Sequence, residues 1–236
     1  MARPQALIYT FWGWTVFCSI ALLASLAILI IRGETRCRRL ARAAARLILR
    51  LGGAQPLVSG TENLPPGPCV IAANHASFAD GILLCAVLPV RFRLVIKQEM
   101  RQVPLAGRML SRIGTVFVER EQGAGRIAGI RTLLKASRAG QSLAIFPEGT
   151  FRPQPGLLPF RSGAFAAAAA GGLPVVPMAI SGCRRLLPSG SWFFTPSRIT
   201  VHFLAPLHPE GQGRRSRQAE RLSQACRSAL AEALEK

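Results

Sequence analysis

Short apolar runs alternate with longer amphipathic segments along most of the chain after residue 68. The runs are rich in β-branched and other large apolar residues and predict strands at 69–73, 93–97, 115–118, 142–146, 174–180 and 199–204. Helix-compatible segments lie at 78–88, 104–113, 126–139, 160–170 and 214–234. Continuously apolar strands that alternate with helices predict an α/β fold, in which a largely parallel central sheet is covered by helices.

The first apolar segment is far longer than a strand. Residues 6–31 form a run of 26 residues without a charged side chain, and about 20 apolar residues suffice for a helix to cross a bilayer. A cleaved signal peptide is the alternative, but its apolar region would be about 7 to 15 residues long and end at a small-residue cleavage site. Because the run stays apolar up to Arg32, residues 1–35 are predicted to be a retained transmembrane anchor.

Charged residues flank this run asymmetrically. Arg3 is the only charged side chain before the run. The segment after the run contains one glutamate, Glu34, and arginines at positions 32, 36, 38, 39, 42, 46 and 50. The positive-inside rule places the more basic flank in the cytoplasm. The sequence therefore predicts a single-pass protein of the cytoplasmic membrane in which the domain after the anchor faces the cytoplasm.

Residues 36–53 are predicted to form a basic amphipathic helix. Arginines recur at helical spacing, Leu40, Ala43, Leu47 and Leu51 lie on a different face, and two glycines end the segment. Such a helix is either a solvated continuation of the anchor or a segment lying on anionic headgroups, where each surface cation contributes about 1 kcal/mol. The adjacent apolar run favours the second reading, so an anionic membrane surface is an expected partner.

The composition fits one membrane-associated domain. Hydrophobic residues make up 50% of the 236 residues, the mean hydropathy is +0.29 and only 17% of residues are charged, against roughly 25% in typical soluble proteins. A chain of this length suits one domain, predicted at 54–236. The net charge of +19 is compatible with nucleic acid, an anionic membrane or acidic substrates. The six cysteines include no Cys-x-x-Cys pair, which argues against a disulfide framework or a zinc site.

The sequence NHASFAD, residues 74–80, follows the predicted strand 69–73. Its side chains would therefore lie at the carboxyl end of a strand, where open α/β sheets place their ligand sites. Asp80, one turn into the next helix, could accept a hydrogen bond from one imidazole nitrogen of His75 and leave the other nitrogen free to take a proton from a hydroxyl. The alternative is structural, with Ser77 and Asp80 forming a helix capping box.

No serine or cysteine nucleophile in a recognisable context accompanies this pair. The hydroxyl that His75 activates is therefore expected to belong to the substrate. One histidine and one aspartate are also too few ligands for zinc, and no metal is expected.

Three further segments carry polar residues, two of them at the ends of predicted strands. GTVFVER ends in Arg120, FPEGTFRP contains Glu148 and Gly149, and PFRSGAF brings Arg161 to the start of a helix. Strand ends in a parallel sheet converge, so two arginines suited to a phosphate, and a turn where glycine permits close backbone approach, are expected beside His75.

The segments NHASFAD, GTVFVER, FPEGTFRP and LPVVPMAISG resemble the four ordered motifs of the glycerolipid acyltransferase family, which includes bacterial 1-acylglycerol-3-phosphate acyltransferases. The resemblance covers about residues 58–206. It implies transfer of an acyl chain from acyl-CoA or acyl-carrier protein to a lysophospholipid hydroxyl, with no cofactor and no covalent enzyme intermediate. His75 would be the general base and Asp80 its partner. The implied substrate-binding residues are Arg120 for the acceptor phosphate, Glu148, Gly149 and Thr150 for the glycerol phosphate, Arg152, Arg161 and Lys97 as further cations, and Pro177 for the acyl pocket.

One departure from the family pattern concerns the third motif. It reads Glu-Gly-Thr-Phe here, where many members have Glu-Gly-Thr-Arg, so the cation would be supplied by Arg152 or Arg161 instead. The leading hypothesis is acylation of lysophosphatidic acid to phosphatidic acid for phospholipid biosynthesis. The second keeps the chemistry and changes the acceptor to lyso-ornithine lipid or another lysophospholipid.

A third hypothesis is a non-enzymatic, membrane-tethered binder of anionic lipid or nucleic acid. Aromatic residues make up only 7% of the chain, and basic residues concentrate beside the apolar run and in the last helix. This distribution lacks the interleaved aromatic and basic side chains on which nucleic-acid bases stack. Nucleic acid is therefore not an expected partner.

Overall fold

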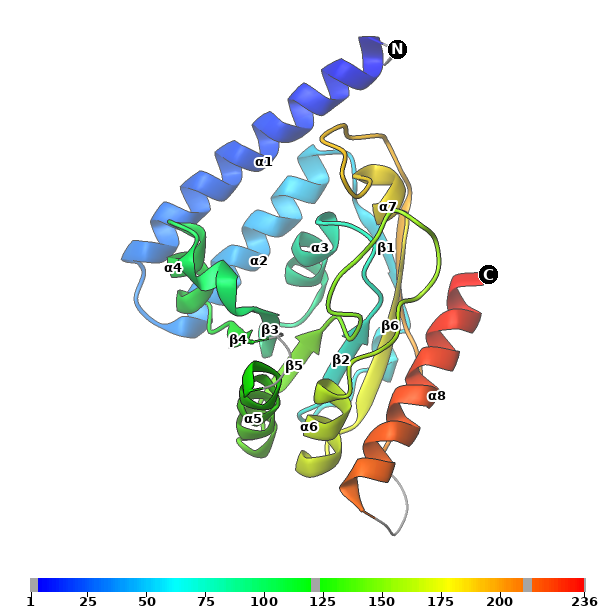
Figure 1. Ribbon diagram of the computed structural model, residues 1–236. Helices are drawn as coiled ribbons and strands as arrows, with labels where there is room; N and C mark the ends of the chain where they lie inside the picture. Colours follow the sequence, from blue (N-terminus) through cyan, green and yellow to red (C-terminus); the bar gives the residue numbers. More distant parts are fainter. Residues whose placement is uncertain (1–3, 120–123, 210–213, 236) are drawn as a thin grey trace.

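A mostly parallel sheet forms the centre of the protein (Figure 1). The computed structural model describes residues 4–119, 124–209 and 214–235. In these ranges seven strands form one sheet in the order β1-β7-β6-β2-β5-β3-β4. Neighbouring strands are parallel except β6 and β7, which are antiparallel. The strands are β1 (Pro56–Ser59), β2 (Val70–Ala73), β3 (Phe92–Lys97), β4 (Val116–Val118), β5 (Ser142–Ile145), β6 (Val175–Ser181) and β7 (Ile199–Phe203).

Helices cover both faces of this sheet. They are α1 (Pro4–Ile30), α2 (Glu34–Leu51), α3 (Ala79–Val87), α4 (Ala106–Arg112), α5 (Ala124–Arg138), α6 (Gly163–Gly171), α7 (Cys183–Leu186) and α8 (Arg215–Glu235), with 3-10 turns η1 (Thr61–Asn63) and η2 (Gln98–Gln102). The predicted α/β fold is thereby confirmed. The predicted strands and the helices between them lie within a few residues of their expected positions, whereas β1 and the single-turn α7 had no expected counterpart.

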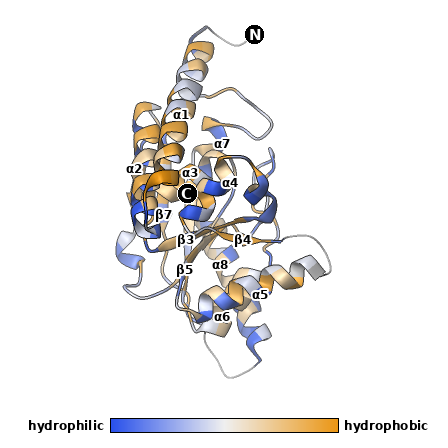
Figure 2. Ribbon diagram, turned by 90° about the vertical axis from the view of Figure 1, so that its left-hand side faces the viewer, coloured by the Kyte–Doolittle hydropathy of each residue, from blue (hydrophilic) through white to orange (hydrophobic). Residues whose placement is uncertain are grey.

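Two apolar layers hold the helices to the sheet. On one face, buried side chains of α2, α3 and α7 pack against β2, β6 and β7. On the other face, α5, α6 and α8 pack against the same sheet through an alanine-rich layer from α6 and a stripe on α8 that includes Cys226 and Leu230. Figure 2 shows α5, α6 and α8 together on one side of the strands and α1 to α4 on the other. Strands β2 and β5 are buried along their whole length, which explains their continuously apolar sequences.

Helix α1 is long and apolar enough to cross a membrane, yet it lies along the domain and does not stand apart from it. Near its start, the Tyr9 hydroxyl donates a hydrogen bond of 2.7 Å to the carbonyl oxygen of Gly52. At its end, the Arg112 side chain donates one of 2.8 Å to the carbonyl oxygen of Ile28. Figure 2 shows the apolar colouring of α1 beside α2. Its outward side chains are large and apolar: Leu7, Ile8, Phe11, Trp12, Leu22, Leu23, Leu26 and Ile30.

The predicted basic helix is present as α2, but several of its arginines face the domain. Arg42 and Arg46 donate hydrogen bonds to the carbonyl oxygen of Ala86, at 3.3 and 3.0 Å, in the last turn of α3. Arg38 contacts Glu34 and the carbonyl oxygen of Ile113. Cations at a helix C-terminus satisfy its unpaired carbonyls and complement its dipole. These three arginines therefore tie α2 to the domain.

Candidate active site

The segment 74–80 follows β2, between the ends of β5 and β6. The Asn74 side chain fixes its start, because its amide group donates to the carbonyl oxygen of Ile180 (2.9 Å) and accepts from the amide N–H of the same residue (2.7 Å). Ala73 is the last residue of β2 that pairs with β6. The Asn74 side chain therefore continues the hydrogen-bond pattern between β2 and β6 beyond the end of β2. It holds the next residue, His75, at the carboxyl ends of the central strands.

His75 and Asp80 form the expected pair. The imidazole Nδ1 lies 2.9 Å from Asp80 Oδ2, and the Asp80 side chain is fully buried whereas that of His75 is 15% exposed. Since a carboxylate only accepts, Nδ1 carries a proton, and in the neutral imidazole Nε2 therefore keeps its lone pair. Asp80 Oδ2 also accepts the backbone N–H groups of Ala76 (2.6 Å) and Ser77 (2.8 Å). One oxygen of Asp80 therefore both orders the loop and orients the imidazole. Only half of the predicted capping box is present, because the Ser77 hydroxyl accepts the N–H of Ala79 and not that of Asp80, and the catalytic role of Asp80 stays a prediction.

A buried thiol completes the surroundings of Asp80. The carboxylate oxygen Oδ1 is buried without a hydrogen-bond partner of ordinary geometry in the described part of the chain. The Cys183 side chain, from the first residue of α7, interacts with the Asp80 carboxylate. Burial, followed by the charge of Asp80 and the hydrogen bond to it, raises the pKa of the Cys183 thiol far above its usual value. The thiol therefore stays protonated.

Aromatic rings hold the imidazole from the side. The ring of Phe146 stacks on that of His75 with centroids 3.9 Å apart and an interplanar angle of 12°. Phe151 lies 4.5 Å from the His75 ring, and Phe78 packs edge-on against Phe151. No local pattern in the sequence indicates this aromatic group, since Phe78 comes from one segment and Phe146 and Phe151 come from another. Phe151 occupies the position at which the family resemblance led us to look for a cation.

Glu148 connects two loops of the site. Its Oε1 accepts the backbone N–H of His75 and its Oε2 accepts that of Leu158, both at 2.7 Å. The residue is 4% exposed, and burial raises the pKa of its carboxyl although both hydrogen bonds oppose this shift. Glu148 therefore positions the His75 backbone. Its predicted contact with a glycerol phosphate stays a prediction.

The turn after Glu148 brings Arg161 close to the backbone. Gly149 has a φ of +74°, and a Cβ at this position would lie 2.5 Å from the Arg161 Nε. Glycine is thus required both for the left-handed conformation and for the close approach of the guanidinium. The side chains of Thr150 and Arg152 are exposed. Arg161 is the predicted cation that the fold places directly against the Glu-Gly-Thr turn.

The other predicted residues are spread more widely. Lys97 is exposed at the end of β3, where it pairs with Val118 of β4. Pro177 is buried within β6 opposite Ala72, so it shapes the sheet. Pro177 does not line the cavity beside His75. Arg120 lies outside the described residues.

A cavity of about 670 Å³ opens beside His75. Its walls come from the 74–76 loop, Glu148, the 155–157 loop, the end of β6, α7 and the C-terminal half of α8. The last helix, α8, contributes Arg227, Ala231 and Leu234 to this wall. The cavity therefore offers an activated imidazole, apolar surface and cations in one place.

Comparisons with known proteins agree with this geometry. The model of the acyltransferase family matches residues 55–181. Over 57% of this chain and 39% of the relative, the chain is 34% identical to a chloroplastic 1-acyl-sn-glycerol-3-phosphate acyltransferase of Brassica napus. A 1-acyl-sn-glycerol-3-phosphate acyltransferase of Saccharomyces cerevisiae is 31% identical over 65% of this chain and 52% of the relative. The chain thus spans about half the length of these curated relatives.

The fold has a counterpart among solved structures. The crystal structure of the 1-acyl-sn-glycerophosphate acyltransferase PlsC from Thermotoga maritima superimposes with a TM-score of 0.75, covering 98% of this chain and 97% of that chain at 21% identity. This likeness supports the fold, and the family model provides the assignment. Because that model matches more than half of the residues, the chain belongs to the acyltransferase family.

Proposed function

We propose that the protein transfers a fatty acyl group from acyl-CoA or acyl-carrier protein to the free hydroxyl of lysophosphatidic acid, giving phosphatidic acid. The observation that carries the proposal is the pairing of His75 Nδ1 with the buried Asp80 carboxylate at 2.9 Å, in a side chain that lines a cavity. The two curated relatives described above are named for this acceptor. No cofactor is required.

The reaction follows from the state of the imidazole. Nε2 takes the proton of the lysolipid hydroxyl while the hydroxyl oxygen forms a bond to the thioester carbonyl carbon. Asp80 stabilises the imidazolium that results. When the carbon–sulfur bond breaks, the imidazolium returns its proton to the leaving thiolate, so the products are the ester and the free thiol. His75 is thereby regenerated without a covalent enzyme intermediate.

The acceptor phosphate requires cations beside His75. We assign this role to Arg120 and Arg161, supported by Arg152 and Lys97, with the Glu-Gly-Thr turn shaping the glycerol site. Arg161 is the best-supported of these residues, because it lies against Gly149 in the turn after β5, the strand next to β2. Removing a charge-assisted contact to a phosphate raises KM while leaving the proton transfer itself in place.

A second acceptor class is favoured by one feature. Phe151 packs beside His75, so an aromatic ring takes the place of a cation next to the base. An acceptor with a different headgroup, such as lyso-ornithine lipid or another lysophospholipid, would keep the His75 and Asp80 chemistry and use other headgroup contacts.

The test is acyl transfer from labelled acyl-CoA by the purified protein, wild type against His75→Ala. The acceptors are lysophosphatidic acid, other lysophospholipids and lyso-ornithine lipid, and acyl-carrier protein is offered as a second donor. Labelled phosphatidic acid with the wild type alone is expected. Label in another lipid alone would replace the acceptor, and equal turnover by His75→Ala would refute the base.

We also propose how the protein sits on the cytoplasmic membrane. The apolar outward face of α1 enters the bilayer, the catalytic domain faces the cytoplasm, and the exposed arginines of α2, at positions 36, 39, 46 and 50, lie near anionic headgroups. A single pass requires the start of α1 to reach the opposite side of the membrane, although Tyr9 ties this end to Gly52.

A cysteine introduced at Gln5 tests this arrangement in sealed vesicles of both orientations. Labelling by a membrane-impermeant maleimide from the non-cytoplasmic side supports the single pass. Labelling only from the cytoplasmic side would mean that α1 lies along the inner leaflet with the domain.

A further inference from the structure

Basic side chains lie in two places around the site. Arg161 lies against the Glu-Gly-Thr turn, in a cavity that Phe146 also lines. Arg184, Arg185 and Arg227 line the cavity that opens beside His75. These three arginines lie outside the four motifs that carry the family resemblance. They also have no role in the reaction proposed above.

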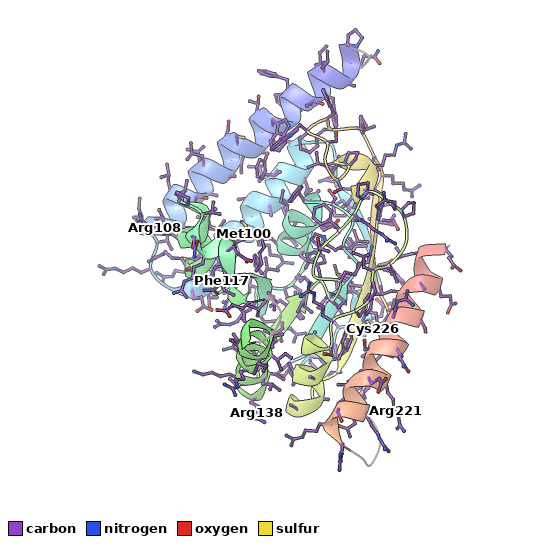
Figure 3. The ribbon with its side chains drawn as sticks, in the orientation of Figure 1. Met100, Arg108, Phe117, Arg138, Arg221 and Cys226 are labelled. Carbon is purple, nitrogen blue, oxygen red and sulfur yellow. The ribbon has the colours of Figure 1, made fainter. Side chains whose placement is uncertain are left out.

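The three arginines are held by structured elements. Arg184 Nη1 donates to the carbonyl oxygens of Arg152, Pro153 and Gln154 at 2.6, 2.6 and 2.8 Å, which fixes its guanidinium at the cavity wall. Arg227 follows Cys226, a fully buried residue of α8. Figure 3 shows Cys226 on the side of α8 that meets the sheet and Arg221 nearer the start of the helix. The position of Arg227 is therefore set by the packing of α8.

Arg185 and Arg227 are available to a ligand. Both side chains are exposed, and neither takes part in an ion pair or side-chain hydrogen bond within residues 4–119, 124–209 and 214–235. The acidic residues of the cavity are Glu148 and Glu235, and both oxygens of Glu148 already accept backbone N–H groups. The cavity wall between α7 and α8 is therefore positively charged beside the base.

The geometry points to Arg185 and Arg227 as a binding site for a phosphate of the acyl donor, an inference that rests on the proposed function. Arg184 holds the adjacent loop. Acyl-CoA and acyl-carrier protein both present a phosphopantetheine arm, so a phosphate follows the thioester in either donor. The lysolipid phosphate is assigned to the opposite side, near Arg161. Two separated cationic sites would let both anionic substrates reach His75 without their phosphates repelling each other at one site.

The experiment compares Arg185→Gln and Arg227→Gln with the wild type. Arg221→Gln serves as the matched control, because Arg221 is also exposed on α8 and does not line the cavity. Binding of CoA itself to the detergent-solubilised protein is measured by titration calorimetry, and KM is measured for acyl-CoA, for acyl-pantetheine, which lacks phosphate, and for lysophosphatidic acid. Loss of one charge-assisted contact is expected to weaken CoA binding about tenfold in each cavity variant.

The expected pattern is specific to a donor phosphate. KM for acyl-CoA rises about tenfold in both variants, whereas KM for acyl-pantetheine and for lysophosphatidic acid stays at the wild-type value and Arg221→Gln changes nothing. Unchanged CoA affinity overturns the proposal, as does a rise in KM for lysophosphatidic acid alone, which would assign the arginines to the acceptor. If the wild type acylates no lysolipid, the proposed function is refuted. The CoA titration would still show whether Arg185 and Arg227 bind the donor phosphate.

Discussion

Replacement of Asn74 by alanine tests how the catalytic loop is held. The Asn74 amide makes hydrogen bonds of 2.9 and 2.7 Å to the backbone of Ile180. Asn74 is 5% exposed and Ile180 is 2% exposed, so both hydrogen bonds are shielded from bulk water in the folded protein. Alanine leaves both the N–H and the carbonyl group of Ile180 without the contacts that Asn74 supplies.

The magnitude follows from these two groups. A buried donor or acceptor left without a partner costs about 1–3 kcal/mol, so Asn74→Ala is expected to lose about 2–6 kcal/mol in the free energy of unfolding. A loss of 1 kcal/mol lowers Tm by roughly 2–4 °C in a domain of this size. Even the lower limit therefore predicts a fall of about 4–8 °C. The value of kcat should fall as well, because His75 follows Asn74 directly.

Thermal unfolding in detergent, followed by circular dichroism, measures this loss. Asn63→Ala is the matched control, because the half-buried Asn63 side chain makes one hydrogen bond, of 2.8 Å to the carbonyl oxygen of Phe203, and should cost less. Asn74 also lines the cavity, so the competing explanation is substrate contact. A variant with wild-type Tm and only an increased KM would refute the structural reasoning.

Three further variants address the base and its surroundings. Asp80→Asn should lower kcat by roughly 10³–10⁴-fold, because an amide favours the wrong tautomer of His75; a loss below tenfold would contradict the pairing. Gly149→Ala should lower Tm and raise KM for the lysolipid, since a Cβ meets Arg161 and φ is +74°; wild-type values of both would contradict the close approach. Cys183→Ser should lower the pKa of His75 that is read from the pH dependence of kcat/KM, because a hydroxyl donates more strongly to Asp80 and weakens the stabilisation of the imidazolium by Asp80. Cys183→Ala should raise this pKa. The same pH dependence in both variants and the wild type would show that the thiol does not affect His75.

The fold could be predicted from the sequence because most strands are buried on both faces. Strand β2 reads as an uninterrupted apolar run, and its length and position leave little alternative to a central strand. The strand β1 was missed because three of its four residues are exposed, so its pattern carries no burial signal. The helix α7 is only one turn long, and a segment of this length has no periodicity to detect.

The pair of His75 and Asp80 could be predicted because its spacing is local. The two residues lie five positions apart, across the start of a helix, and the helix start itself directs the carboxylate back to the loop. The contacts of Phe146 and Arg227 with this site depend on how distant segments meet. No local pattern indicates such contacts, which is why the aromatic group and the cavity wall on α8 emerged only from the structure.

The loop after α7 contacts both the apolar helix α1 and the segment 74–80. Ser77 donates a hydrogen bond of 2.7 Å to the carbonyl oxygen of Leu187, at the start of that loop. Farther along, Phe194 exchanges hydrogen bonds with the Thr10 hydroxyl, and the ring of Trp14 contacts that of Trp192. A displacement of α1 relative to the domain would therefore move the loop on which Ser77 depends. Since Ser77 also donates its backbone N–H to Asp80, the contacts that attach α1 to the domain are linked through this loop to the position of the His75 and Asp80 pair.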